Sequence, residues 1–267
     1  MWHQLAVAAA LATDSHPQPG FDHAEFDRLL RTHVVDGMVD YDAFAADPGF
    51  DRYLGQLAAT DPAGWARDEQ LAFWLNAYNA YTIRLIVKHR ERGSIRNINR
   101  ALGLFKGPGP WAEKLVVVGG TTYDLETVEQ QIIRPTFREP RIHFALVCAA
   151  MGCPPLRSEA YRGADLERQL EDQSRIFLTQ SPDKNRVDLA RRTVWVSEVF
   201  KFNDYAKDFG GSDATIMRFI ARFYPPGPER DLLESGSAKL TYTKYDWTLN
   251  SQEQARKRPA SVGRGRS

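Results

Sequence analysis

The sequence predicts a single α+β domain in which several helices pack on a small, mainly antiparallel sheet. Three observations support this fold class. A long apolar stripe recurs at helical spacing over residues 70–90. Short strand-like segments meet at turn pairs such as Asp36-Gly37 and Gly119-Gly120, which is typical of hairpins. Neither a repeat nor a composition change divides the chain before its last residues, so we expect one globular domain over residues 21–250.

The expected elements alternate along the chain. Helices are predicted where apolar residues recur at i, i+3 and i+4, and the last of them opens at a Ser-Asp cap and stops at two prolines. These helical ranges are 21–33, 40–59, 70–90, 125–134, 164–179 and 213–224. Strands are predicted where short runs are apolar or alternate with polar residues. These strand ranges are 34–39, 114–124, 142–147, 187–196 and 239–245.

Composition excludes several classes of protein. A formal net charge of +1 gives no global field that would select nucleic acid. Residues 250–267 hold five Lys/Arg and one acid, and we expect residues 251–267 to be a basic, disordered tail. No phosphate-binding fingerprint points to a nucleotide, flavin or pyridoxal cofactor, so no cofactor is expected.

The N-terminal residues carry a weak export signal. Residues 5–12 form a short apolar run that ends in an Ala-x-Ala pattern, as at the end of a secretory signal, but no Lys or Arg precedes it. The run is too short to span a membrane, so no transmembrane segment is expected. Residues 1–20 are therefore predicted to be a signal remnant or a disordered leader. This favours an exported, periplasmic protein over a cytoplasmic one.

Both cysteines of the chain, Cys148 and Cys153, fall in one short stretch. It begins with residues 142–147, which are apolar apart from His143 and predict a buried strand. A glycine and two prolines follow, and these cannot continue a strand, so the two cysteines are expected in an irregular loop at its end. Loops on a rigid scaffold commonly carry reactive groups. This stretch is the candidate site.

Two asparagines interrupt the apolar stripe of residues 70–90. Asn76 and Asn79 lie three residues apart and therefore on one face of the predicted helix. Helix interiors disfavour asparagine, because its amide competes for backbone hydrogen bonds. Either the two amides bridge neighbouring backbone, or one of them points into a cleft and polarises a substrate carbonyl.

The motifs together resemble the uncharacterised family catalogued as domain of unknown function 547, found in bacteria and plants. The resemblance rests on Phe73-Trp-Leu-Asn-Ala-Tyr-Asn-Ala80, Leu125-Glu-Thr-Val-Glu-Gln-Gln-Ile-Ile-Arg134, residues 143–156, Val199-Phe-Lys-Phe-Asn-Asp-Tyr205 and Tyr245-Asp-Trp-Thr-Leu-Asn250. It covers roughly residues 21–250. Where the family commonly has Glu-His, this chain has Glu129-Gln130, so no role is carried over to residue 130. The resemblance implies a papain- or transglutaminase-like fold with Glu, His and Cys as a candidate triad.

The first functional hypothesis is a thiol-dependent hydrolase or acyl transferase, similar to a cysteine peptidase or amidase, acting on a peptide, amide or ester. A nucleophilic cysteine needs a base, and the base needs an acceptor that fixes its tautomer. The candidate residues are Cys148 or Cys153 as nucleophile, His143 as base, Glu129 as the group that orients it, and Asn76 or Asn79 as the oxyanion donor. The two cysteines are equal on spacing alone, and the resemblance favours Cys148. In a straight strand His143 and Cys148 would lie about 17 Å apart on opposite faces, so the triad requires a break before Cys148.

The second hypothesis is a non-catalytic binding or scaffolding domain in which the same residues only fix a loop that contacts a protein partner. A Cys148–Cys153 disulfide in an oxidising compartment would remove both nucleophiles. A zinc site built from these cysteines and His143 would lack a fourth ligand, so no metal is expected.

Overall fold

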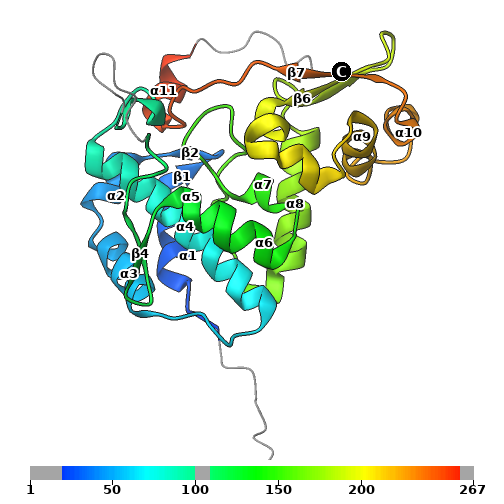
Figure 1. The fold of residues 1–267 in the computed structure, drawn as a ribbon. Coiled ribbons are helices and arrows are strands. Elements are labelled where there is room, and N and C mark those ends of the chain that lie inside the picture. The colour runs from blue at the N-terminus through cyan, green and yellow to red at the C-terminus, as the bar shows by residue number, and fades with distance from the viewer. Residues whose placement is uncertain (1–19, 100–108, 259–267) are drawn as a thin grey trace, which may run out of the picture.

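The long helix α4 (Arg67–His89) lies at the centre of the computed structural model, which describes residues 20–99 and 109–258 (Figure 1). Almost the whole length of this helix between Leu71 and Ile86 is buried, and helices from the N-terminal and middle parts of the chain pack against it. Burial of a large apolar side chain contributes about 1.5–3 kcal/mol, so this helix anchors the hydrophobic core. The prediction for residues 70–90 is confirmed.

The N-terminal elements form a helical layer beside α4. They are α1 (Ala24–His33), β1 (Val34–Val35), β2 (Met38–Val39), α2 (Tyr41–Ala46) and α3 (Pro48–Ala59). Asp36 and Gly37 both have positive φ angles, of 50° and 77°, as a two-residue hairpin turn requires. The helix expected over residues 40–59 is divided in two, because Asp47 leaves helical geometry and accepts a hydrogen bond from the backbone N–H of Gly49 as the cap of α3.

The middle of the chain supplies a hairpin and a continuous helical run. Its elements are η1 (Ile95–Asn97), β3 (Val116–Val118), β4 (Thr121–Tyr123), α5 (Leu125–Thr127), η2 (Val128–Ile133) and α6 (Arg134–Phe137). The hairpin turns at Gly119-Gly120 and the helix begins at residue 125, as predicted. The η2 segment is a π-helix, a wider turn that is frequent at functional sites, and Glu129 lies in it.

Residues 142–147 do not form the predicted strand. Ile142–Ala145 make one helical turn, α7, after which the chain is irregular. Side chains satisfy backbone groups that a strand would offer to a neighbour: Gln173 donates to the carbonyl of Phe144, and Asn79 bonds the backbone on both sides of Leu146. The prediction was wrong because a six-residue apolar run fits a buried helical turn as well as a buried strand.

The C-terminal half completes the domain with helices and a three-stranded sheet. Its elements are η3 (Gly163–Asp165), α8 (Leu166–Thr179), β5 (Arg186–Asp188), β6 (Thr193–Ser197), η4 (Glu198–Phe209), α9 (Asp213–Ala221), α10 (Pro228–Ser235), β7 (Lys239–Thr243) and α11 (Gln252–Lys257). β6 pairs antiparallel with β5 and parallel with β7. With the two hairpins this gives an α+β fold whose strand pairs are mainly antiparallel, although the strands form three small sheets and not one.

A returning C-terminal segment, residues 244–251, runs from β7 back to the N-terminal hairpin (Figure 1). Asn250 fixes its end: its carbonyl accepts from the N–H of Val39, and its side-chain oxygen accepts from the hydroxyl of Tyr41 at 2.6 Å. The segment also pairs with the cysteine loop, because Met151 and Gly152 donate backbone hydrogen bonds to Thr248 and Asp246. Residues distant in sequence are thereby brought to one side of the domain.

Four expectations concern the ends of the chain, membrane-spanning helices and the wider fold family. The leader expected over residues 1–20 lies outside the described residues except for Gly20. Residues 252–257 form α11, so the part of the chain expected to be a disordered tail begins with a helix; residues 259–267 lie outside the described part. Within the described ranges, no helix is both long and apolar enough to cross a membrane. The papain- or transglutaminase-like fold stays a prediction.

Candidate functional site

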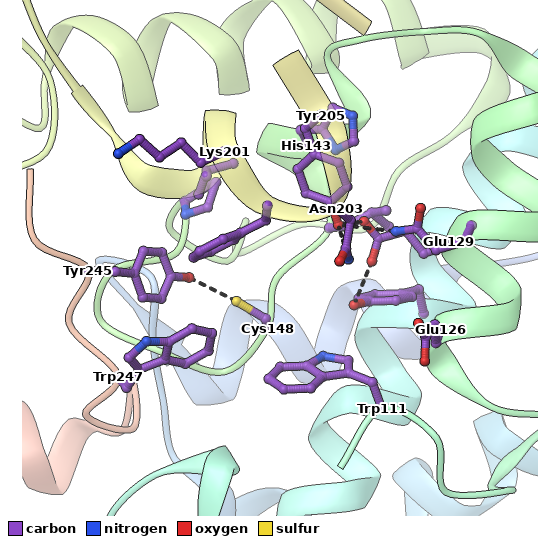
Figure 2. A pocket seen from close by; sticks show the side chains of 16 residues that line it. Trp111, Glu126, Glu129, His143, Cys148, Lys201, Asn203, Tyr205, Tyr245 and Trp247 are labelled. Atoms are coloured by element: carbon purple, nitrogen blue, oxygen red, sulfur yellow. Dashed lines mark hydrogen bonds between the residues drawn. The ribbon is translucent and has the colours of Figure 1, made fainter. Parts of the chain in front are cut away.

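A cavity of about 480 Å³ opens where the cysteine loop, the π-helix, η4 and the returning segment meet (Figure 2). Volumes of this size are typical of small-molecule sites. The residues that line it are Tyr78, Trp111, Glu126, Glu129, Gln130, His143, Leu146, Cys148, Pro154, Val199, Lys201, Phe202, Asn203, Tyr205, Tyr245 and Trp247. Three of the predicted site residues are among them: Glu129, His143 and Cys148.

The two cysteines differ in their access to this cavity. Cys148 is half-buried and lines the cavity, whereas Cys153 is 1% exposed and does not. The structure joins them in a disulfide, with Cα atoms 6.2 Å apart. The hydroxyl of Tyr245 lies 2.9 Å from the sulfur of Cys148 and 3.0 Å from that of Cys153. In this state neither sulfur is a nucleophile, so thiol chemistry requires reduction.

His143 is buried and faces a carboxylate that the sequence did not indicate. Its side chain is 0% exposed, and Nε2 lies 2.6 Å from a carboxylate oxygen of Asp208. The ring of Tyr205 stacks on the imidazole with centroids 3.9 Å apart. A carboxylate only accepts, so Nε2 carries the proton, and in the neutral ring Nδ1 keeps its lone pair. Nδ1 has no hydrogen-bond partner among the described residues.

Asp208 is held as a carboxylate by its neighbours. Burial by itself would raise the pKa of Asp208, but hydrogen bonds from His143 and Arg134 outweigh this and lower the pKa to about 2. Arg134 donates through Nε at 2.8 Å. The group that orients His143 is therefore Asp208, and the role predicted for Glu129 is corrected.

Glu129 is engaged by two tyrosines. Its carboxylate is 8% exposed and accepts hydrogen bonds from the hydroxyl of Tyr78, at 3.2 Å, and from that of Tyr205. Glu129 thus reaches His143 only through the Tyr205 ring that stacks on the imidazole. Figure 2 shows Glu129 and Cys148 apart from each other, with the sulfur directed toward Tyr245.

Asn76 and Asn79 both bridge neighbouring backbone, and neither points into a cleft toward a substrate carbonyl. Asn76 donates to the carbonyl of Tyr161 at 2.8 Å and accepts from its N–H at 2.9 Å. Asn79 donates to the carbonyl of Ala145 and accepts from the N–H of Val147, both at 3.0 Å. Neither amide lines the cavity, so neither can polarise a carbonyl bound there. Asn79 fixes the backbone that leads into Cys148.

Aromatic rings form much of the cavity wall, and sequence reasoning gave them no role. Trp247 packs against Trp111, Phe202 and Tyr245, with ring centroids 6.0, 5.7 and 4.5 Å away. Most of these residues lie in segments whose motifs were noted only for their resemblance to a family. Their gathering depends on the returning segment, which no local pattern predicts. Asp208, which is 65 residues from His143, was missed for the same reason.

No group of three or more His, Cys, Asp and Glu residues that could hold a metal ion occurs in residues 20–99 and 109–258. The lining of the cavity offers covalent chemistry through Cys148 once it is reduced, or binding through its rings and carboxylates.

Comparison with known proteins identifies the central segment of the chain. Residues 62–178 match the model of the family described as "Protein of unknown function, DUF547". This confirms the resemblance over that segment, which contains all six residues predicted for the site. No curated protein and no solved structure matches the chain.

Proposed function

We propose that this DUF547 domain, with its cysteines reduced, is a thiol-dependent hydrolase or acyl transferase that acts on an amide or ester through Cys148. The observation that carries the proposal is the common cavity: Cys148 and His143, from one stretch, and Glu129, from η2, line the same space. Catalytic groups of this kind are expected in a concave site lined by apolar walls.

Cys148 is the nucleophile in this proposal, because it opens to the cavity and Cys153 is buried behind it. The hydroxyl of Tyr245, 2.9 Å from the sulfur of Cys148, favours the thiolate, since a hydrogen bond to the charged form of a group stabilises that form. Burial raises the pKa of Tyr245, so its hydroxyl keeps its proton and acts as the donor.

The imidazole of His143 takes the thiol proton at Nδ1 and returns it to the leaving group, while Asp208 holds Nε2. The thiolate attacks the carbonyl carbon, and collapse of the intermediate expels an amine or alcohol, which receives that proton. Water, or a second nucleophile in a transferase, then cleaves the thioester and restores the thiol. In the disulfide form the side chain of His143 is fully covered, so these proton transfers require a movement that brings Nδ1 to the thiol.

A second candidate is a binding domain that holds a ligand without transforming it. Two observations favour it: the cysteines are paired, and the side chain of His143 is fully covered. The cavity would then bind a small molecule or a peptide side chain, and the His143–Asp208 pair would only fix η4 against α7.

Thiol reactivity separates the two candidates. We would measure the rate of iodoacetamide labelling against pH for the matched variants Cys153→Ser and Cys148→Ser, each of which cannot form the disulfide. The hydrolase proposal predicts that Cys148 in the first variant reacts at least about tenfold faster at pH 7 than Cys153 in the second. It also predicts an apparent pKa for Cys148 well below the usual value of about 8.5.

The double variant Cys153→Ser/His143→Ala should lose this reactivity, and circular dichroism would check that it is folded. Cys153→Ser/Asp208→Asn keeps the imidazole, and the labelling rate of its Cys148 should fall between the rates in Cys153→Ser and in Cys153→Ser/His143→Ala. A Cys148 that titrates near or above 8.5 with His143 present would refute the hydrolase and leave the binding domain.

A further inference from the structure

Glu129 carries a buried negative charge that no cation neutralises within the described residues. Among the residues that the structure describes, three with a carboxylate are buried: Asp27, Asp124 and Glu129. Asp27 pairs with Arg31 at 2.7 Å, and Asp124 pairs with Lys114. Glu129 forms no ion pair in residues 20–99 and 109–258, and it is the one of the three that lines the cavity. Burying a charge without a partner is costly, so this site is arranged for a cation that is not part of the described chain.

The partners that Glu129 does have are neutral donors. Burial first, and then the negative charge of Glu129, raises the pKa of Tyr78 and of Tyr205. Both hydroxyls therefore stay protonated and donate to the carboxylate. Two such hydrogen bonds fix the orientation of Glu129 without cancelling its charge.

Among the described residues, Lys201 lines the cavity and Arg134 lies beside it, and both have other partners. Arg134 pairs with Asp208, donates to Gln130, and stacks its guanidinium 4.9 Å from the centroid of the Tyr205 ring. The ammonium of Lys201 lies 3.8 Å from the ring centroid of Tyr242, which does not line the cavity.

The wall across the cavity from Glu129 is aromatic. Aromatic faces attract cations, with a benefit that grows when the cation is desolvated. The rings of Trp111, Phe202, Tyr245 and Trp247 line the cavity, and Figure 2 shows Glu129 across it from Tyr245 and Trp247. The guanidinium of Arg96 lies 5.0 Å from the ring centroid of Trp247, so at least one ring of this aromatic wall already makes a cation–π contact.

We propose that the cavity binds an organic cation, with the ammonium or guanidinium group of the ligand against Glu129 and its apolar part against the aromatic wall. The volume of about 480 Å³ has room for a basic amino acid with an attached acyl group. This deepens the proposed function, on which the next statement rests: the substrate of the hydrolase is an amide or ester that carries a basic side chain. The binding itself requires no thiol.

The test uses the Cys148→Ser variant, which cannot turn a substrate over. Isothermal titration would compare benzoyl-arginine amide with benzoyl-citrulline amide, which has the same shape without the charge. Benzylammonium would serve as a second, smaller cation. We expect the arginine compound to bind at least about tenfold more tightly than the citrulline compound, because only the guanidinium forms a charge-assisted hydrogen bond with the carboxylate. Adding Glu129→Gln should remove this preference.

Glu229→Gln is the matched control. It removes the same charge from an exposed site on α10, away from the cavity, and should leave the preference unchanged. Equal binding of the two amides, a preference that survives Glu129→Gln, or failure of both cations to bind at millimolar concentration would overturn the proposal. Cation binding together with an inert Cys148 would instead refute only the hydrolase.

Discussion

The amide of Asn79 is predicted to stabilise the domain strongly, because its two hydrogen bonds satisfy buried backbone groups. Asn79 is buried, and its partners are the carbonyl of Ala145 and the N–H of Val147. Each hydrogen bond contributes about 0.5–1.5 kcal/mol, and leaving a buried partner unsatisfied costs about 1–3 kcal/mol. Asn79→Ala should therefore lower the free energy of unfolding by about 2–4 kcal/mol.

Urea denaturation followed by circular dichroism would measure this effect with the disulfide intact. With an m value of about 3 kcal/mol/M, the midpoint should fall by about 1 M. The control is Asn97→Ala, because the amide of Asn97 is exposed and donates to the carboxylate of Glu91; we expect a change of about 0.5 kcal/mol or less. A loss below about 1 kcal/mol for Asn79→Ala would refute the structural role and return Asn79 to the list of groups that could act on a ligand.

Three further predictions follow from the structure. Burial lowers the pKa of His23 to about 3, although the negative charge of Asp22 opposes this shift. Below pH 6.5 the unfolded chain therefore binds a proton at His23 that the folded protein does not bind. Stability should fall as pH drops from about 6.5 to about 3, and His23→Phe should flatten that dependence in chemical denaturation. The pKa of Asp208 is lowered to about 2 in the folded protein, below its ordinary value near 4. The ionised carboxylate therefore stabilises the fold above pH 4, and this stabilisation is lost as pH falls toward about 2. The difference in unfolding free energy between the wild type and Asp208→Asn should therefore shrink over that interval. Gly152→Ala would place Cβ 2.8 Å from the backbone nitrogen of Asp246 and should lower the free energy of unfolding by about 1–3 kcal/mol. Gly55→Ala lies in open space on α3 and should raise it by about 0.5–1 kcal/mol; thermal melts of both variants would measure these changes.

Local patterns predicted the elements well where one physical signal dominated. The stripe on α4 has a helical period over many turns, and both hairpins turn at residues that tolerate positive φ. The short run of residues 142–147 offered no such signal. Its backbone is satisfied by Asn79 and by Gln173, which come from distant helices, and no property of the run itself reveals them.

The candidate site was predicted in part for a similar reason. Residue type and proximity in sequence pointed to Cys148 and His143, and the structure places both at one cavity. The carboxylate partner of His143 could not be found in this way. Asp208 follows a kink in η4 where Asn203 and Asp204 have positive φ angles of 41° and 60°, and only the fold carries it back to α7.

The polar residues near the cavity contribute to it in two different ways. Asn79 holds the backbone before Cys148, and the side chain of Asn250 holds the end of the returning segment that carries Tyr245 and Trp247. These groups act by fixing walls, since their hydrogen-bonding atoms are engaged by the chain itself. Glu129 differs from them, because its charge is left without a counterion among the described residues and faces the cavity. A buried charge with no cation among the described residues is better explained by a ligand than by the described fold, since the same two tyrosines could have bonded a neutral glutamine at a smaller desolvation cost.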